Sequence, residues 1–230
     1  MGKAVLEAEN LVKDYETRSV RTRALDGVTL QIEEGECSAL AGPSGSGKTT
    51  LLNLLGTLDA PTEGRVLVDG DDVSDLSEAE RSKLRLEKLG FVFQAFNLIP
   101  VLTAAENVEF ALVLQGAPAK ERRARAMDLL SEVGLDDLWS KRPTEMSGGE
   151  QQRVAVARAI ATNPRIVLAD EPTANLDSRT AESLLDLMLA MNHDRGVTFL
   201  FSTHDPRVMR RARRIIELCD GRITRDGPSP

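Results

Sequence analysis

Gly42-Pro43-Ser44-Gly45-Ser46-Gly47-Lys48-Thr49 is the stretch that decides the fold. It matches the pattern G-x-x-x-x-G-K-[ST] at every fixed position. Its three glycines let a loop turn its backbone N–H groups inward around an anion, because no Cβ atom stands in the way. An apolar run at 37–41 enters the loop as a strand, and a helix is expected to leave it at Lys48. The stretch therefore predicts a phosphate-binding loop at the N-terminus of a helix.

The side chains of this loop indicate a nucleoside triphosphate held with a metal ion. Lys48 can reach the β- and γ-phosphates of ATP, and the Thr49 hydroxyl can ligate Mg²⁺. With the glycines Gly42, Gly45 and Gly47, the hydroxyl residues Ser44, Ser46 and Thr50 complete the local set that we expect to bind ATP. A glycine- and serine-rich loop without a ligand is the simpler alternative, but the strand–loop–helix setting disfavours it.

An acidic pair follows a second apolar strand at 166–169. Such a strand is buried on both faces, so carboxylates at its end emerge where ligands bind in open α/β sheets. Asp170 is the expected partner of Mg²⁺, and Glu171 is expected to polarise the attacking water. Because Glu171 precedes Pro172, an extended backbone is predicted for it. The alternative is an acidic pair that only caps a turn or helix.

The order of predicted elements is α/β. Strands are expected at 4–7, 28–32, 37–41, 65–68, 91–93, 166–169, 197–202 and 215–218, and Asp220-Gly221 is expected to turn a hairpin into a last short strand. Capping boxes at Ser77/Glu80 and Thr103/Glu106 predict two helix starts. Helices dominate roughly 95–160, which predicts one mainly parallel sheet with a helical insertion. Fraying is expected from Asp226 onward.

The composition limits the function classes. The 230 residues fit one compact domain, and the net charge of −7 argues against a general nucleic-acid partner. The N-terminus lacks a signal-peptide core, and no window approaches the roughly 18 apolar residues that a membrane span needs. A cytoplasmic chain is therefore expected.

A second glycine motif opens another helix at Ser147-Gly148-Gly149-Glu150. Ser147 and Glu150 have capping-box spacing, so a well-capped helix start is the simplest interpretation. Two glycines in the first turn cost about 1 kcal/mol each relative to Ala, however. They are useful where backbone N–H groups must approach a ligand closely, which indicates a second anion site.

Taken in order, these features resemble the ATP-binding cassette (ABC) ATPases over nearly the whole chain. The matching positions are Tyr15, the loop at 42–49, Gln94, the motif at 147–151, Asp170-Glu171, Ala174-Asn175-Leu176-Asp177 and His204. The resemblance implies a P-loop NTPase (RecA-like) core with an N-terminal antiparallel β subdomain. It divides a single cassette at 1–226 into a core at about 1–94 and 161–226 and a helical subdomain at about 95–160, with 227–230 as a frayed tail.

The resemblance also implies roles for single residues. In a head-to-tail dimer, Ser147, Gly148, Gly149 and Glu150 would contact the ATP on the other subunit's phosphate loop. Tyr15 would stack on adenine, Gln94 would contact Mg²⁺ and the attacking water, and His204 would steady the γ-phosphate. The metal set is thus Thr49, Gln94 and Asp170, the catalytic set is Glu171 and His204, and Asp177 would contact the dimer partner. Ordinary structural roles remain open for Tyr15, Gln94, His204 and Asp177.

Two departures from the family pattern fall in the second motif, which in the family usually begins with Leu where this chain has Met146. The family usually has Gln where this chain has Glu150. A carboxylate near a triphosphate would weaken binding unless it points away, and its capping-box position predicts that it does.

The segments 90–100 and 103–108 are similar to the lipoprotein-release and macrolide-export branch of the family. This implies an ATPase subunit on the cytoplasmic face of the membrane, driving separate integral membrane permease subunits. Two alternatives remain: a cassette ATPase of DNA repair or translation without a membrane partner, and a phosphate-loop kinase or GTPase.

Overall fold

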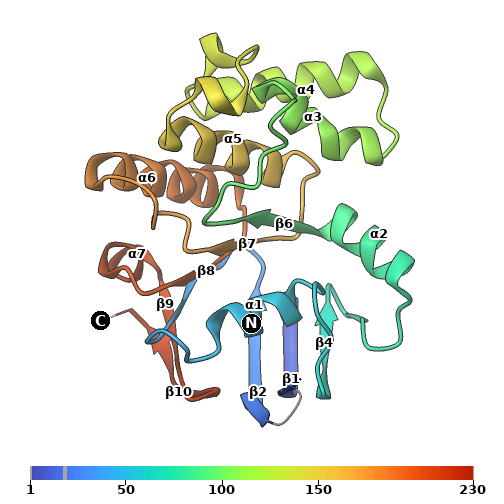
Figure 1. Ribbon diagram of the computed structural model, residues 1–230, viewed down its shortest axis with the longest axis vertical. Coiled ribbons are helices and arrows are strands. Elements are labelled where there is room, and N and C mark those ends of the chain that lie inside the picture. The colour runs from blue at the N-terminus through green and yellow to red at the C-terminus, as the bar shows by residue number, and fades with distance from the viewer. Residues whose placement is uncertain (1, 18–19, 230) are drawn as a thin grey trace.

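Two β-sheets enclose one helix between them in the computed structural model, which describes residues 2–17 and 20–229 (Figure 1). The antiparallel sheet has the order β2-β1-β4-β5, and the larger sheet has the order β10-β9-β3-β8-β7-β6. The strands are β1 Ala4–Thr17, β2 Val20–Glu33, β3 Cys37–Ala41, β4 Glu63–Val68, β5 Asp71–Asp72, β6 Leu89–Val92, β7 Ile166–Asp170, β8 Phe199–Thr203, β9 Arg214–Cys219 and β10 Arg222–Pro228. The helices are α1 Lys48–Leu55, α2 Glu78–Lys88, α3 Ala104–Leu114, α4 Ala119–Glu132, α5 Gly148–Ile160, α6 Ser178–Arg195 and α7 Pro206–Arg211, with short 3₁₀ turns at Asp136–Leu138 and Pro143–Glu145.

In the larger sheet, every neighbouring pair is parallel except β9 and β10. The carboxyl ends of β3, β7 and β8 therefore meet at one edge, where the phosphate loop, Glu171 and His204 follow their strands. The predicted mainly parallel core and N-terminal antiparallel sheet are both confirmed.

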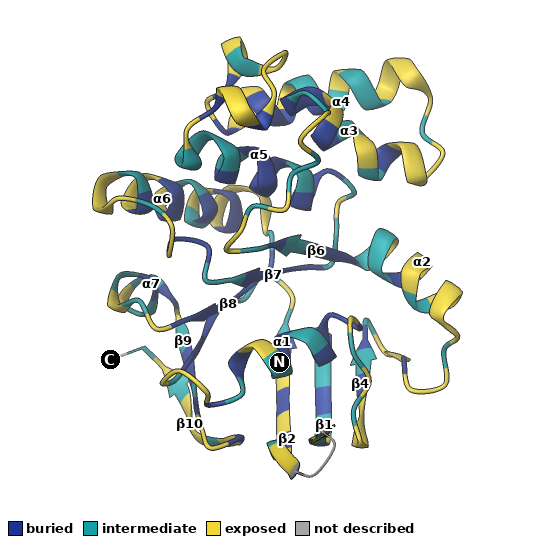
Figure 2. Cartoon of the chain, in the orientation of Figure 1, coloured by how far each residue is buried: buried dark blue, intermediate teal, exposed yellow. Residues whose placement is uncertain are grey.

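Alternating side chains give this sheet two apolar faces. One face, with Leu40, Leu168 and Leu200, packs against α1 and the antiparallel sheet. The other face, with Val167 and Phe201, packs against the helices α3 to α6. Figure 2 shows buried residues along the sheet and on the inward sides of α5 and α6. The loops at the strand ends are thus held by two hydrophobic cores.

The helix starts follow the sequence signals. Lys48 begins α1, and both predicted capping boxes form, at Ser77 and at Thr103. Within the described residues, none of the helices is both long enough and apolar enough to cross a membrane.

Two predictions about strands are corrected. β1 and β2 extend well beyond 4–7 and 28–32, because each pairs along the other's length. The C-terminal segment does not fray from Asp226, nor over 227–229. β10 pairs with β9 as far as Pro228, the Arg214 guanidinium binds the Asp226 carboxylate, and Ser229 N donates to Arg213 O at 3.1 Å.

Gly90 in β6 lets α5 approach the sheet closely. A Cβ built at this position would lie 2.4 Å from Ala159 O, a backbone atom that cannot move aside. We expect Gly90→Ala to lower the free energy of unfolding by about 1–3 kcal/mol, the usual cost of overpacking a core. Urea denaturation measures the change. Gly227→Ala is the control, since no atom of the described part of the chain lies within 4 Å of its Cβ position. Equal stability of the two variants would contradict the close packing.

Candidate functional site

The phosphate loop joins β3 to α1 and leaves the start of that helix open. Gly47 is its N-cap residue, with a left-handed φ of 103°, and as a glycine it has no side chain to cap the first turn. A Cβ at Gly47 would lie 2.6 Å from Ala24 O, and one at Gly42 would lie 2.2 Å from Leu218 O. Glycine is therefore required here by packing, and the open N–H groups of the first turn are available to an anion.

Lys48 holds the loop in shape. Its ammonium donates hydrogen bonds to Gly42 O at 2.7 Å and Pro43 O at 3.0 Å, and the residue is buried. These carbonyls orient the ammonium at the loop and leave its third N–H free to donate a hydrogen bond to a phosphate oxygen.

A cavity of about 600 Å³ lies against this loop and brings together residues that follow four strands, β3, β6, β7 and β8. Its lining is Ala24, Pro43, Ser44, Gly45, Gly47, Lys48, Thr49, Thr50, Gln94, Glu171, Ala174 and His204. Most of the predicted ATP-binding residues thus share one cavity, together with both predicted catalytic residues. Gly42, Ser46 and Tyr15 are outside its lining.

The side-chain oxygens of Asp170 and Thr49 lie close together. Thr49 Oγ1 lies 3.5 Å from Asp170 Oδ2, while Asp170 Oδ1 is buried and has no hydrogen-bond partner among the described residues. Burial, reinforced by the neighbouring Glu171 charge, raises the pKa of the Asp170 carboxyl. An unpartnered carboxylate oxygen beside a hydroxyl fits Mg²⁺, which takes a few oxygen ligands from protein and the rest from phosphate and water.

Glu171 is held by the end of β8. Its carboxylate lies 2.6 Å from His204 Nδ1 through Oε1 and accepts a hydrogen bond from Thr203 Oγ1 at 3.3 Å through Oε2. The side chain of Glu171 is mostly buried, whereas that of His204 is exposed. The arrangement aims a carboxylate and an imidazole at the same cavity.

The predicted extended backbone of Glu171 is wrong. Its φ is +44°, in the left-handed region that a non-glycine residue adopts at a cost of roughly 1–3 kcal/mol. Glu171 N donates to Ser202 O at 2.9 Å, and Glu171 O accepts from Ala174 N at 3.1 Å. These two bonds turn the chain sharply at the end of β7 and override the local preference set by Pro172.

Gln94 follows β6 and is paired with Asn175. Asn175 Nδ2 donates to Gln94 O at 3.0 Å, and Gln94 Nε2 donates to Asn175 Oδ1 at 3.4 Å. No role was predicted for Asn175 itself, which matches the family pattern only as part of Ala174-Asn175-Leu176-Asp177. Thr203, which donates to Glu171, was also missed, since a threonine within an apolar strand carries no distinctive signal.

Ser147 caps α5 in the predicted capping box. Ser147 N donates to Glu150 Oε2 at 2.7 Å, so the Glu150 carboxylate is turned back onto the cap, as predicted. Gly149 also packs tightly, because a Cβ there would lie 2.3 Å from Thr180 Cγ2. None of the four motif residues lines the cavity of the phosphate loop, and α5 lies on the opposite side of the large sheet from α1 (Figure 1).

Two predicted site residues are engaged locally. The Tyr15 hydroxyl donates to Asp59 Oδ2 at 3.2 Å, the ring stacks against the Lys13 ammonium, and the side chain is half-exposed. Asp177 is the N-cap of α6 and accepts from Arg179 N and Thr180 N. The Thr180 side chain, followed by these backbone N–H groups, lowers the pKa of the Asp177 carboxyl. The roles in adenine stacking and dimer contact stay predictions.

Residues 25–174 match the family model described as ABC transporter. The chain belongs to the ABC transporter family. An uncharacterized ABC transporter ATP-binding protein of Thermotoga maritima is 47% identical over 96% of this chain and 94% of its own length. The dimeric ATP-binding cassette MJ0796, in a post-hydrolysis state with ADP and Pi, is 45% identical with a TM-score of 0.90, covering 98% of this chain and 99% of that one. Clostridium perfringens cbiO1, part of the ABC transporter complex cbiONQ, is 30% identical with a TM-score of 0.87, covering 99% of this chain and 89% of that one.

This ABC cassette is therefore an ATP-binding and ATP-hydrolysing subunit. In this structure the phosphate loop, the carboxylate after β7 and the histidine after β8 line one cavity. The kinase and GTPase alternative is excluded by the family match.

Proposed function

We propose that two copies of this cassette bind two ATP molecules between them in a head-to-tail dimer and drive an integral membrane permease. The dimer is inferred from one observation, that the two glycine-lined helix starts of a single chain lie apart from one another. The phosphate loop lines the ATP cavity, but residues 147–150 do not. Because both helix starts are suited to anions, the second serves a nucleotide bound to another copy. The dimeric MJ0796 structures support this arrangement.

Hydrolysis in this proposal is general-base catalysis within a preorganised cavity. Glu171 accepts a proton from the attacking water, whose oxygen then bonds to the γ-phosphorus as the bond to the β–γ bridging oxygen breaks. His204, 2.6 Å from the same carboxylate, orients Glu171 and steadies the γ-phosphate. Thr49, Asp170 and Gln94 would hold Mg²⁺, which supplies neutralisation of phosphate charge.

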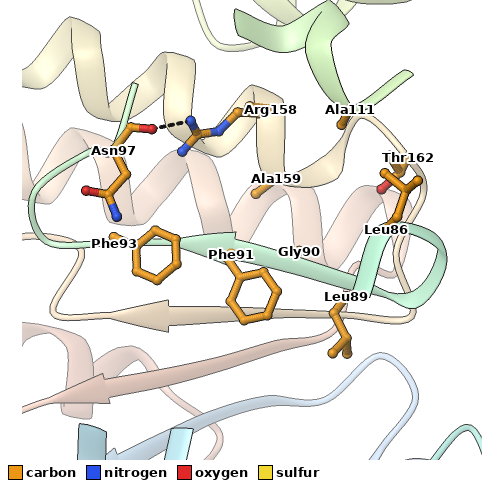
Figure 3. Close-up of a pocket in the computed structure, with 10 residues that line it drawn as sticks. All are labelled: Leu86, Leu89, Gly90, Phe91, Phe93, Asn97, Ala111, Arg158, Ala159 and Thr162. Atoms are coloured by element: carbon orange, nitrogen blue, oxygen red, sulfur yellow. Dashed lines mark hydrogen bonds between the residues drawn. The ribbon is translucent and has the colours of Figure 1, made fainter. Parts of the chain in front are cut away.

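The permease is expected to dock beside the Gln94 segment. A groove of about 260 Å³ there is lined mostly by apolar groups, including Leu86, Leu89, Phe91 and Phe93 (Figure 3). On nearby α3, the side chains of Phe110, Val113 and Leu114 are large, apolar and exposed. Exposed apolar groups near the Gln94 segment are suited to a protein partner that responds to nucleotide.

The finer assignments rest on the sequence. The segments at 90–100 and 103–108 support the lipoprotein-release and macrolide-export branch, and with it a peripheral location on the cytoplasmic face of the membrane. The division into a core at 1–94 and 161–226 and a helical subdomain at 95–160 is part of the same proposal. In it, the helical subdomain presents Ser147 to the partner copy.

Ser147→Arg tests the cross-subunit site. We expect the monomer to bind ATP with unchanged affinity, because Ser147 lies outside the cavity of its own phosphate loop. The rate of ATP hydrolysis should fall at least about tenfold, because a bulky side chain blocks the approach of the second copy. A loss of about 1.4 kcal/mol of transition-state stabilisation is enough to lower the rate by that factor. Calorimetric titration and phosphate release measure the two quantities.

Ser77→Arg is the matched control. Ser77 caps α2 in the same kind of capping box, so both variants lose a cap worth typically about 1 kcal/mol. Only Ser147→Arg should lose hydrolysis. Full activity of Ser147→Arg would rule out the cross-subunit role.

A further inference from the structure

Gln152 is a fully buried polar side chain at the centre of the molecule that the site described above does not use. It lies on α5, and its Nε2 donates hydrogen bonds to Phe93 O at 3.3 Å and to Pro172 O at 2.8 Å. Phe93 directly precedes Gln94, and Pro172 directly follows Glu171. One amide group therefore ties together the two segments that carry the water-directing residues.

The orientation of this amide is determined by its surroundings. Both partners are carbonyl oxygens, which only accept, so the NH₂ end must face them. The other end, Oε1, is buried and has no hydrogen-bond partner among the described residues. Leaving an acceptor unpaired in the interior is costly, and such sites call for an explanation beyond stability.

α5 also holds the far end of the Gln94 segment. Arg158 donates through Nη1 to Asn97 O and through Nη2 to Phe96 O at 2.9 Å, and Figure 3 shows its contact with Asn97. Phe96 and Asn97 have left-handed φ values of 61° and 51°. Arg158 thus stabilises a strained turn, while Gln152 holds the start of the same segment.

We propose that Gln152 is a positioning residue for ATP hydrolysis, which sets Gln94 and Glu171 relative to one another and couples both to the Ser147 end of α5. This inference rests on the proposed function, in which Ser147 contacts the nucleotide of the partner copy. Gln152 stands five residues after Ser147 on one helix, an axial rise of about 7.5 Å. A helix of this length moves as a rigid body, so a shift of its start when the partner's ATP binds is carried to both catalytic segments.

Gln152→Met tests the proposal, since methionine has a similar length and no donor. We expect the kcat for ATP hydrolysis by the full chain to fall about 10- to 100-fold, because a misplacement of about 1 Å can cost a factor of that order. The affinity of the monomer for ATP should change less than about twofold, because the substitution leaves the phosphate loop untouched. A twofold change in Kd corresponds to RT ln 2, which is a small fraction of the free energy of binding.

Asn192→Leu is the matched control. Asn192 is also a buried amide, and its Nδ2 donates to two backbone carbonyls, Gly35 O at 2.9 Å and Val197 O at 2.7 Å. Those carbonyls lie near the amino ends of β3 and β8, away from the ATP cavity. This variant should lose stability and keep its kcat.

Amide hydrogen exchange provides a readout besides activity. Without nucleotide, peptides covering 93–98 and 171–176 should exchange faster in Gln152→Met than in the wild type, and at the wild-type rate in Asn192→Leu. The proposal requires both the kcat loss and the faster exchange. Either one without the other, or neither, overturns it. If Gln152→Met does not fold, Gln152→Asn carries the same two readouts, because its shorter amide cannot reach both carbonyls.

Failure of the inference can be told apart from failure of the proposed function. If Glu171→Gln is inactive while Gln152→Met is fully active, only the positioning role is lost. If Glu171→Gln hydrolyses ATP at the wild-type rate, the proposed base itself is wrong.

Discussion

Glu171→Gln is expected to bind ATP normally and to hydrolyse it about 100- to 10,000-fold more slowly, the range that a general base contributes. The amide keeps the size of the carboxylate but cannot take a proton from water. It can still meet Thr203 Oγ1 and His204 Nδ1, so the cavity should keep its shape. Because ATP then persists between two copies, a dimer should accumulate on size exclusion when ATP is present.

The control for this substitution is Glu80→Gln. Glu80 belongs to the capping box of α2, where glutamine can make the same backbone contact. We expect wild-type phosphate release from it. Glu171→Gln that turns over at the normal rate would show that another group receives the proton.

Lys48→Ala is expected to weaken ATP binding by roughly 10- to 150-fold, or about 1.5–3 kcal/mol, the usual worth of a hydrogen bond to a charged group. The substitution removes the buried ammonium that, in the proposed function, contacts the β- and γ-phosphates. It also leaves Gly42 O and Pro43 O without their donor, which loosens the loop itself. Both effects act on binding, so the loss should appear in the Kd measured by calorimetry.

Lys141→Ala serves as the comparison, because Lys141 is exposed and, among the residues that the structure describes, its ammonium pairs with Glu145 alone, on the surface. Its removal takes away one positive charge with no effect expected on the Kd for ATP. If Lys48→Ala bound ATP as tightly as the wild type, the loop at 42–49 would not be the phosphate site.

Features that depend on neighbours in the chain were predictable. The loop at 42–49, the start of α1 at Lys48 and the capping boxes at Ser77, Thr103 and Ser147 all form as expected. In each case the interacting groups are at most a few residues apart, so residue type and spacing already specify the local geometry. The acidic pair after β7 was predictable for a related reason, since a buried parallel strand ends at the ligand-binding edge.

Features that depend on contacts between distant segments could not be predicted from the sequence. The backbone of Glu171 is set by Ser202 rather than by Pro172, and Asp226 is held in β10 by Arg214. The pairing of Asn175 with Gln94 and the burial of Gln152 between Phe93 and Pro172 likewise join residues that are 20 or more positions apart.

The sequence by itself determined the phosphate loop, the α/β order and the family of this protein, because these are written in short patterns with strong local physical causes. Only the tertiary structure decided how the catalytic segments are oriented and what holds them in place. Those properties arise from hydrogen bonds between loops that meet at one edge of the sheet, and hydrogen bonds of this kind leave no fixed spacing in the sequence.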